Sequence, residues 1–238
     1  MTFSVLVFQH DPNDGPGYLE EALLQRGARP TIIRLDEGDA VPDISAYDML
    51  LVMGGAMNVY QEDKYPWLVE ETYAISRAVE AGKAVLGVCL GGQLLAKALG
   101  APVHLGVATE IGLTPITLTE AGENDPLFEG LPQIESVEWH DDTFDIPSGA
   151  VALARSEGCA HQAFRFGQYA YGLQFHPEVS PVMLAEWIKE AGELIDRSSF
   201  QRAVESKVVA LQTQADHLVD NFVRGCMPAH LLDNIGKA

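Results

Sequence analysis

The stretch Ala84-Val85-Leu86-Gly87-Val88-Cys89-Leu90-Gly91-Gly92-Gln93 decides how this chain folds. Its first five residues form a continuous apolar run, which is typical of a strand buried on both faces of a parallel sheet. A short helix is predicted from about residue 91 to residue 99, with Gly100 at its end. The pattern G-x-C-x-G places a glycine two residues before and after Cys89, as a sharp strand-to-helix turn requires. We therefore predict a tight turn that presents the Cys89 thiol at the end of a buried strand.

Strand and helix patterns alternate through the first half of the chain. Apolar strand patterns precede residue 84 at residues 5–8, 31–35 and 49–53, and helical patterns lie at residues 19–26 and 66–81. This alternation predicts βαβ units and an α/β fold with a doubly wound, mostly parallel sheet and flanking helices. Further strand patterns occur at residues 111–118, 136–139, 150–154, 162–166 and 169–175. We expect some of these strands to join the sheet in antiparallel orientation.

The C-terminal part is predicted to be helical. One helix is expected over residues 182–195 and a longer one over 199–223, with Ser198 or Ser199 as its N-cap. An apolar stripe runs along the longer helix through Val204, Val208, Leu211, Ala215, Leu218 and Phe222. We therefore divide the chain into a catalytic domain, residues 1–181, and a C-terminal helical extension, residues 182–238. The stripe packs either on the same domain, which we favour, or at a homodimer interface.

Composition excludes several classes of partner. The net charge of −19 disfavours nucleic acid and anionic membranes, and the apolar run at the N-terminus is too short for a membrane span or a signal peptide. Three cysteines without a CxxC pair indicate a reducing, cytoplasmic location, with Cys159 and Cys226 as buried structural residues. The seven histidines show no metal-ligand spacing, so we expect neither a metal nor a cofactor.

A second candidate segment is Gln174-Phe175-His176-Pro177-Glu178. Side chains at positions i and i+2 of a strand point to the same face, so His176 and Glu178 are expected to meet at the strand end. A histidine oriented by a carboxylate is the base that activates a thiol nucleophile. The start of a helix also favours the Cys89 thiolate through its free N–H groups.

Two backbone N–H groups are candidates for an oxyanion hole. One belongs to Leu90, the residue after the nucleophile. The other belongs to Gly55, because the pair Gly54-Gly55 directly follows a predicted strand and active sites form at the carboxyl ends of parallel strands. Gly54 allows close backbone approach and is expected to bind substrate.

Together these segments resemble the class I (triad) glutamine amidotransferase family, which has a flavodoxin-like fold. The resemblance is carried by Val52-Met53-Gly54-Gly55-Ala56-Met57, Gly87 to Gln93 and Gln174 to Glu178, and it covers roughly residues 1–180. Free-standing members related to the amidotransferase domain of GMP synthase are the most similar. Many members have proline where this chain has Ala56, which leaves the rigidity of the oxyanion loop open.

The resemblance implies a chemistry. Cys89 attacks the side-chain amide of glutamine, His176 transfers the proton, and ammonia leaves before water hydrolyses the γ-glutamyl thioester. Gln93 is implied to hold the substrate, whereas no catalytic role is assigned to His140 in Glu138-Trp139-His140-Asp141-Asp142. Either a separate synthetase subunit receives the ammonia, or the enzyme hydrolyses γ-glutamyl peptides or conjugates with the same triad.

Three other interpretations are weaker. An α/β-hydrolase with a cysteine nucleophile would have its acid before the histidine in the chain, whereas Glu178 follows His176. A catalytically silent regulatory or assembly subunit would not need the complete Cys/His/Glu set that this chain contains, so the presence of all three residues argues against it. A nucleotide-binding module lacks its glycine-rich motifs here.

Overall fold

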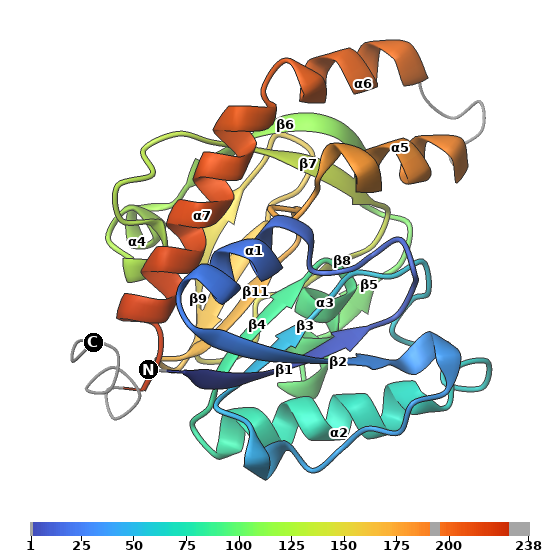
Figure 1. Ribbon diagram of the computed structural model, residues 1–238, viewed down its shortest axis with the longest axis vertical. Helices are drawn as coiled ribbons and strands as arrows, with labels where there is room; N and C mark the ends of the chain where they lie inside the picture. The colour runs from blue at the N-terminus through green and yellow to red at the C-terminus, as the bar shows by residue number, and fades with distance from the viewer. Residues whose placement is uncertain (1, 191–195, 229–238) are drawn as a thin grey trace.

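The computed structural model, which describes residues 2–190 and 196–228, is built around a nine-stranded sheet between layers of helices (Figure 1). The strand order is β2-β1-β3-β4-β11-β10-β9-β6-β7, and β5 pairs with β8 in a separate two-stranded sheet. Neighbouring strands from β2 to β11 are parallel, and those from β11 to β7 are antiparallel. The predicted α/β class and the antiparallel additions are confirmed.

The strands come from both halves of the chain. Their bounds are β1 (Phe3–Gln9), β2 (Ala28–Arg34), β3 (Met49–Val52), β4 (Ala84–Val88), β5 (Val103–His104), β6 (Glu110–Leu118), β7 (Ile134–His140), β8 (Thr143–Phe144), β9 (Ala150–Arg155), β10 (Ala163–Phe166) and β11 (Ala170–Leu173).

The helices connect these strands and follow them. Their bounds are α1 (Gly17–Gln25), α2 (Trp67–Glu80), α3 (Leu90–Ala98), α4 (Glu120–Glu123), α5 (Pro181–Glu190), α6 (Arg197–Glu205) and α7 (Val208–Gly225), with short 3₁₀ turns η1 (Leu35–Glu37), η2 (Ile44–Ala46) and η3 (Pro126–Phe128). Among the described residues, no helix is both long enough and apolar enough to cross a bilayer.

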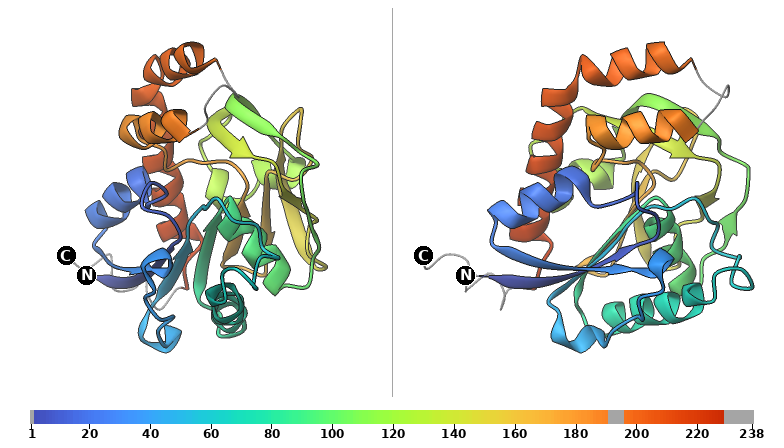
Figure 2. Two further views of the ribbon diagram at one scale, coloured as in Figure 1. Left: turned by 90° about the vertical axis from the view of Figure 1, so that its right-hand side faces the viewer. Right: turned by 45° about the vertical axis from the view of Figure 1, so that its right-hand side comes forward.

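Both faces of the sheet are buried at the parallel strands β1, β3 and β4, as their near-continuous apolar sequences predict. Successive side chains of β1 point to opposite faces. Val5 and Val7 belong to the core beneath α1 and α7, whereas Leu6 and Phe8 belong to the core beneath α2 and α3. Figure 2 shows these two helical layers on opposite sides of the sheet.

A third, smaller core lies where α5 and α6 approach the β6–β7 hairpin. Trp187 of α5 and Phe200 of α6 pack there with Val137 of β7. The rings of Trp139 and Trp187 meet edge to face with centroids 5.7 Å apart. This core attaches the C-terminal helices to the antiparallel half of the sheet.

The single long helix predicted over residues 199–223 is wrong. The chain forms α6 and α7 instead, separated at Ser206 and Lys207, and Asp196 rather than Ser198 or Ser199 is the N-cap. The reason is that the two parts of the stripe bury against different cores. Val204 belongs to the third core, whereas Leu218 and Phe222 belong to the core beneath α1 and α7. A straight helix could not reach both surfaces.

Helix α7 packs along α1 and over η3. The guanidinium group of Arg26 contacts Asp216 at 2.8 Å and Asp220 at 3.0 Å, and the rings of Phe222 and Tyr171 meet edge to face at 5.8 Å. From these contacts we infer that the C-terminal helices and the sheet form one folding unit. The boundary at residue 181 and a homodimer both stay predictions, and residues 191–195 of the expected helix 182–195 lie outside the described residues.

The first turn of helix α3 packs against the backbone of β3 and β11 rather than against side chains, and this contact positions the Cys89 turn. A Cβ atom added to Gly91 would lie 2.1 Å from the carbonyl oxygen of Val52 in β3, and one added to Gly92 would lie 2.6 Å from that of Leu173 in β11. A Cβ atom on Gly87 would lie 2.4 Å from the carbonyl oxygen of Gly91. Only glycine fits at these three positions.

Substituting Phe222 with alanine should strongly destabilise the protein. The side chain is 1% exposed, so its loss leaves a cavity in the largest core, and we expect the free energy of unfolding to fall by about 3–5 kcal/mol. Urea denaturation of the full chain measures this change. Val209→Ala on the same helix, where the side chain is 74% exposed, is the control and should change it little. Equal effects of the two substitutions would contradict the packing of α7 on the sheet.

Substituting Gly91 with alanine should also destabilise the protein. The new methyl group must displace the backbone of β3, and overpacking of this kind costs about 1–3 kcal/mol. Gly15→Ala is the matched control, because its Cβ atom would meet only the Gln9 side chain at 3.6 Å. Thermal unfolding of both variants compares them, and a Gly91 variant as stable as the control would disprove the close approach.

Candidate active site

Cys89 occupies the turn between β4 and α3, with a backbone geometry that L-residues rarely adopt. Its φ of 51° and ψ of −109° make it the single non-glycine residue with positive φ in the described part of the chain. The Cys89 N–H donates to the carbonyl oxygen of Leu173 at 2.8 Å, which ties the turn to β11. Strained residues of this kind persist where the surrounding structure over-determines them, and they cluster at functional sites.

His176 and Glu178 lie together beside this turn. The Glu178 carboxylate accepts a hydrogen bond from Nδ1 of His176 at 2.7 Å, and both side chains are buried. Strand β11 ends at Leu173, earlier than the sequence predicts, and His176 instead pairs with Val137 of β7 through a single bridge. Its Nε2 atom has no hydrogen-bond partner among the described residues. That nitrogen is therefore available to a neighbouring thiol or a substrate.

The charge state of His176 follows from these neighbours. Burial alone would lower the pKa of His176, but the negative charge of Glu178 and the adjacent Cys89 outweigh burial and raise this pKa well above its ordinary value. These neighbours therefore favour the protonated form of His176, once Nε2 has accepted a proton. The ring also meets the indole of Trp187 edge to face at a centroid distance of 4.8 Å.

Gly54 and Gly55 follow β3, and Gly54 runs close to Cys89 and His176. A Cβ atom on Gly54 would lie 3.2 Å from Cε1 of His176 and 3.7 Å from Cβ of Cys89. Gly55 lines the pocket in front of Cys89. Leu90 lies in the first turn of α3, where N–H groups lack an intrahelical acceptor. The loop thus approaches Cys89 closely, and the oxyanion roles of Gly55 and Leu90 stay predictions.

A buried ion pair that sequence reasoning missed holds the glycine loop. His10, directly after β1, contacts the carbonyl oxygen of Gly54 through Nδ1 at 2.8 Å and the Glu71 carboxylate of α2 through Nε2 at 2.7 Å. Both partners are acceptors, so both ring nitrogens donate when His10 is protonated. Burial opposes this charge, but Glu71 raises the pKa of His10. The indole of Trp67 stacks on the ring with centroids 5.3 Å apart. The one feature of the sequence that points to a role for His10 in the site is its position directly after a predicted strand.

Gln93 and a second glutamine support the wall of the site. The Gln93 side-chain amide donates to the carbonyl oxygen of Asp142 at 3.1 Å and to Oε1 of Gln174 at 3.3 Å. The Gln174 amide in turn lies 3.7 Å from the Cys89 sulfur. The structure therefore brings the predicted Gln93 to the pocket and adds Gln174, which the sequence placed beside His176 without a role.

These groups surround one pocket of about 420 Å³. Its lining includes the thiol, the imidazole and residues from the hairpin and α5, namely Asp14, Gly55, Ala56, Met57, Asn58, Gln61, Cys89, Gln93, Ile111, Trp139, His140, Asp141, Asp142, His176 and Trp187. Another cavity of about 420 Å³, beside α2, contains neither cysteine nor histidine among its lining residues. The Cys89 pocket is thus the one of these two that contains a thiol and an imidazole.

Comparison with known proteins places this arrangement in a family. The model of the class-I glutamine amidotransferase family matches residues 17–189. The glutamine amidotransferase-like protein YfeJ of Salmonella typhimurium is 33% identical over 202 residues, which cover 83% of this chain and 84% of YfeJ. One subunit of the glutamine-hydrolyzing GMP synthase of Pyrococcus abyssi is 39% identical over 118 residues, which cover 46% of this chain and 61% of that protein.

Solved structures agree with the sequence comparisons. A glutamine amidotransferase of Thermotoga maritima superposes with a TM-score of 0.85 at 28% identity, covering 93% of this chain and 98% of the other. The family match extends from α1 to α5, and so includes the Cys89 turn, the glycine loop and the His176–Glu178 pair. The chain therefore belongs to the class I glutamine amidotransferase family.

Proposed function

We propose that this protein hydrolyses the side-chain amide of glutamine through a thioester on Cys89, releasing ammonia and glutamate. One observation carries the proposal. The strained Cys89 turn, the Gly54–Gly55 loop and the hydrogen-bonded His176–Glu178 pair meet in one pocket. This is the arrangement of nucleophile, base and orienting acid that acyl transfer from an amide needs.

The first half of the proposed reaction forms the thioester. The thiol proton passes to Nε2 of His176, and the Cys89 sulfur bonds to the amide carbon. The N–H groups of Gly55 and Leu90 stabilise the oxyanion of the tetrahedral intermediate. The carbon–nitrogen bond then breaks while His176 returns the proton to the leaving nitrogen, so ammonia departs.

The second half of the reaction consumes water. Neutral His176 takes a proton from a water molecule, the hydroxide attacks the thioester carbon, and the carbon–sulfur bond breaks to give glutamate and the free thiol. Glu178 keeps the ring in one orientation and stabilises its protonated form throughout. We assign Gln93 and Gly54 to substrate binding, since one supports the pocket wall and the other leaves room beside the thiol.

The charge of the pocket favours glutamine over acidic γ-glutamyl peptides. Asp14, Asp141 and Asp142 line it, and none of its lining residues is lysine or arginine. Burial raises the pKa of Asp14 to about 6, so this side chain still carries negative charge at neutral pH. A free α-ammonium group suits such walls, whereas the additional carboxylate of a peptide such as glutathione does not. Hydrolysis of γ-glutamyl peptides or conjugates is therefore the second candidate.

Partner and location follow as further proposals. The Pyrococcus abyssi relative is named as one subunit of GMP synthase. By analogy we propose that ammonia from this protein passes to a synthetase subunit in trans. All three cysteines are free thiols, which suits a reducing compartment such as the cytoplasm.

Removal of the nucleophile tests the proposed reaction. We expect Cys89→Ala to abolish glutamate release from glutamine, because no other group can form the thioester. The assay follows glutamate release from glutamine and from glutathione by the purified full chain. Cys226→Ala, at a free cysteine outside the pocket, is the control and should retain activity.

Each outcome of this assay has a distinct meaning. Release from glutamine that depends on Cys89 supports an amidotransferase, even if the rate is low without a partner. Faster release from glutathione would favour the γ-glutamyl hydrolase. A protein that releases glutamate from neither, and whose Cys89 does not react with a diazoketone analogue of glutamine, would be a catalytically silent regulatory subunit.

The pH profile tests the His176–Glu178 pair. Glu178→Gln removes the negative charge that raises the pKa of His176, so this pKa should fall. Because protonated His176 delivers the proton to ammonia, activity declines as pH rises through its pKa. The alkaline limb of kcat against pH should thus move to lower pH in Glu178→Gln and stay in place in Glu186→Gln, the control on the outer part of α5. An unmoved limb in both variants would show that Glu178 does not set the charge of His176.

A further inference from the structure

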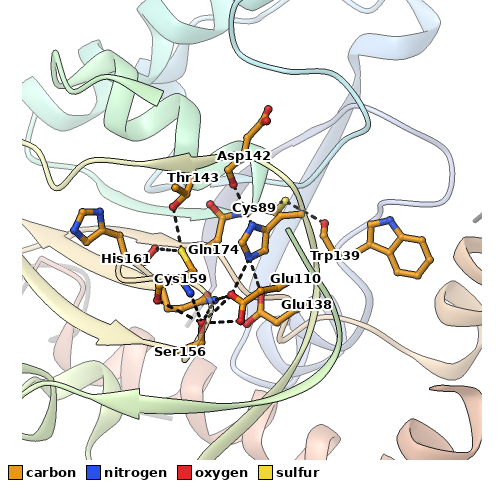
Figure 3. A network of polar contacts seen from close by, with 12 residues as sticks. Cys89, Glu110, Glu138, Trp139, Asp142, Thr143, Ser156, Cys159, His161 and Gln174 are labelled. Carbon is orange, nitrogen blue, oxygen red and sulfur yellow. Dashed lines mark hydrogen bonds and ion pairs between the residues drawn. The ribbon is translucent and has the colours of Figure 1, made fainter. Parts of the chain in front are cut away.

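A cluster of buried polar side chains lies behind the wall of the Cys89 pocket. It comprises Glu110 from β6, Glu138 and His140 from β7, and Cys159 from the loop after β9. Ligand-type atoms of Glu110, His140 and Cys159 all lie within 4.8 Å of one another. Figure 3 shows Glu110, Glu138, Ser156 and Cys159 in one network of polar contacts. The proposed reaction uses none of these four side chains.

The hydrogen bond of His140 fixes which ring nitrogen faces the cluster. Nδ1 lies 3.1 Å from the carbonyl oxygen of Asp142, which can only accept, so Nδ1 carries a proton. Nε2 lies 3.2 Å from Oε2 of Glu138 and 3.4 Å from Oε2 of Glu110, without forming a hydrogen bond to either. In neutral His140 a lone pair therefore faces two carboxylates. Such an arrangement needs a positive charge at its centre.

Other oxygen atoms in the cluster and beside it also lack a hydrogen-bond donor. Both carboxylate oxygens of Glu138 are buried without a hydrogen-bond partner in the described residues, and so is Oε1 of Gln162. The Glu138 side chain is completely buried. An uncompensated buried carboxylate is costly, and such groups are usually paired or coordinate a metal.

We propose that Glu110, Glu138, His140 and Cys159 bind a zinc ion. One nitrogen, one sulfur and two oxygen ligands suit Zn²⁺, which accepts all three types in tetrahedral sites. Bond lengths of about 2.0–2.3 Å place tetrahedral ligands about 3.3–3.8 Å apart. The separations of 3.2 Å and 3.4 Å between His140 Nε2 and the two carboxylates fit closely, and the Cys159 sulfur lies within 4.8 Å of the ligand atoms of Glu110 and His140. The Cys159 thiol must release its proton to ligate the ion, because zinc binds the thiolate form.

Neighbouring side chains already orient the proposed ligands. The Ser156 hydroxyl lies 2.8 Å and 2.7 Å from the two oxygens of Glu110, and the Gln162 amide donates to Oε2 of Glu110 at 2.8 Å. The Thr143 hydroxyl lies 3.2 Å from the sulfur of Cys159. Metal ligands in proteins are commonly held by such outer contacts. Four protein ligands leave no open position, so the site is structural rather than catalytic.

The position of the ion connects it to the active site. Trp139 lies between Glu138 and His140 in β7, and its carbonyl oxygen is 4.0 Å from the Cys89 sulfur. The Asp142 carbonyl oxygen contacts both His140 and the amide of Gln93. Zinc at this place would hold the pocket wall formed by residues 139–142. Sequence spacing alone did not indicate a metal because the ligands come from three separate segments.

Metal analysis of the untagged full chain tests the proposal. After treatment with a chelator and incubation with Zn²⁺, gel filtration and elemental analysis should find one zinc per chain. Co²⁺ in place of Zn²⁺ should give a sulfur-to-metal charge-transfer band. Both signals should be lost in Cys159→Ser and reduced in Glu138→Gln. Ser156→Ala, which removes an outer contact, should weaken zinc binding about 10–100-fold.

Two controls make the result decisive. Cys226→Ser removes another buried thiol outside the cluster, and Cys89→Ala removes the catalytic one; both should still bind one zinc ion. Circular dichroism establishes that each variant is folded. Absence of bound zinc in the wild type, or zinc that is retained by Cys159→Ser and lost in Cys89→Ala, would overturn the proposal. If the wild type binds no zinc, protonated His140 would be the positive charge between the carboxylates of Glu110 and Glu138.

Discussion

The close approach of helix α3 to the backbone of the sheet is the constraint on which the rest of the site depends. Gly91 and Gly92 bring the first turn of α3 against the carbonyl groups of β3 and β11. That approach forces Cys89 to a φ of 51°, which costs about 1–3 kcal/mol for a residue with a side chain. The surrounding β-strands and the buried α3 helix maintain the turn. The backbone of Cys89 is therefore held in this conformation by packing within the chain itself.

The active-site groups come from neighbouring strand ends. His10, Gly54 and Cys89 follow β1, β3 and β4, and these adjacent parallel strands end at the same edge of the sheet. Parallel topology thus places side chains from distant parts of the chain within a few ångströms of each other. The β6–β7 hairpin and α5 close the opposite side with Trp139 and Trp187. The C-terminal helices therefore contribute to the site as well as to the core.

Two groups of buried ionisable side chains lie beside the pocket, and they differ in how their charges are paired. His10 and Glu71 form a direct contact of 2.7 Å, and the pair holds the glycine loop in place. The carboxylates of Glu110 and Glu138 instead face the Nε2 atom of His140 at longer distances, and neither forms a hydrogen bond with that atom. A hydrogen bond joins His10 to Glu71. The group of Glu110, Glu138 and His140 has no positive charge unless His140 is protonated or a cation binds. Both arrangements lie behind backbone that runs close to Cys89.

The sequence by itself determined the α/β class, the parallel and antiparallel parts of the sheet, and the family. These properties depend on local signals, namely apolar runs of strand length, helical periodicity and glycines around Cys89. Only the tertiary structure decided that α6 and α7 are separate helices, because their apolar residues face different cores. It also decided that His10, Gln174 and Trp187 lie around Cys89, His176 and Glu178. Contacts between residues far apart in the chain depend on strand order and helix packing, which no local pattern encodes.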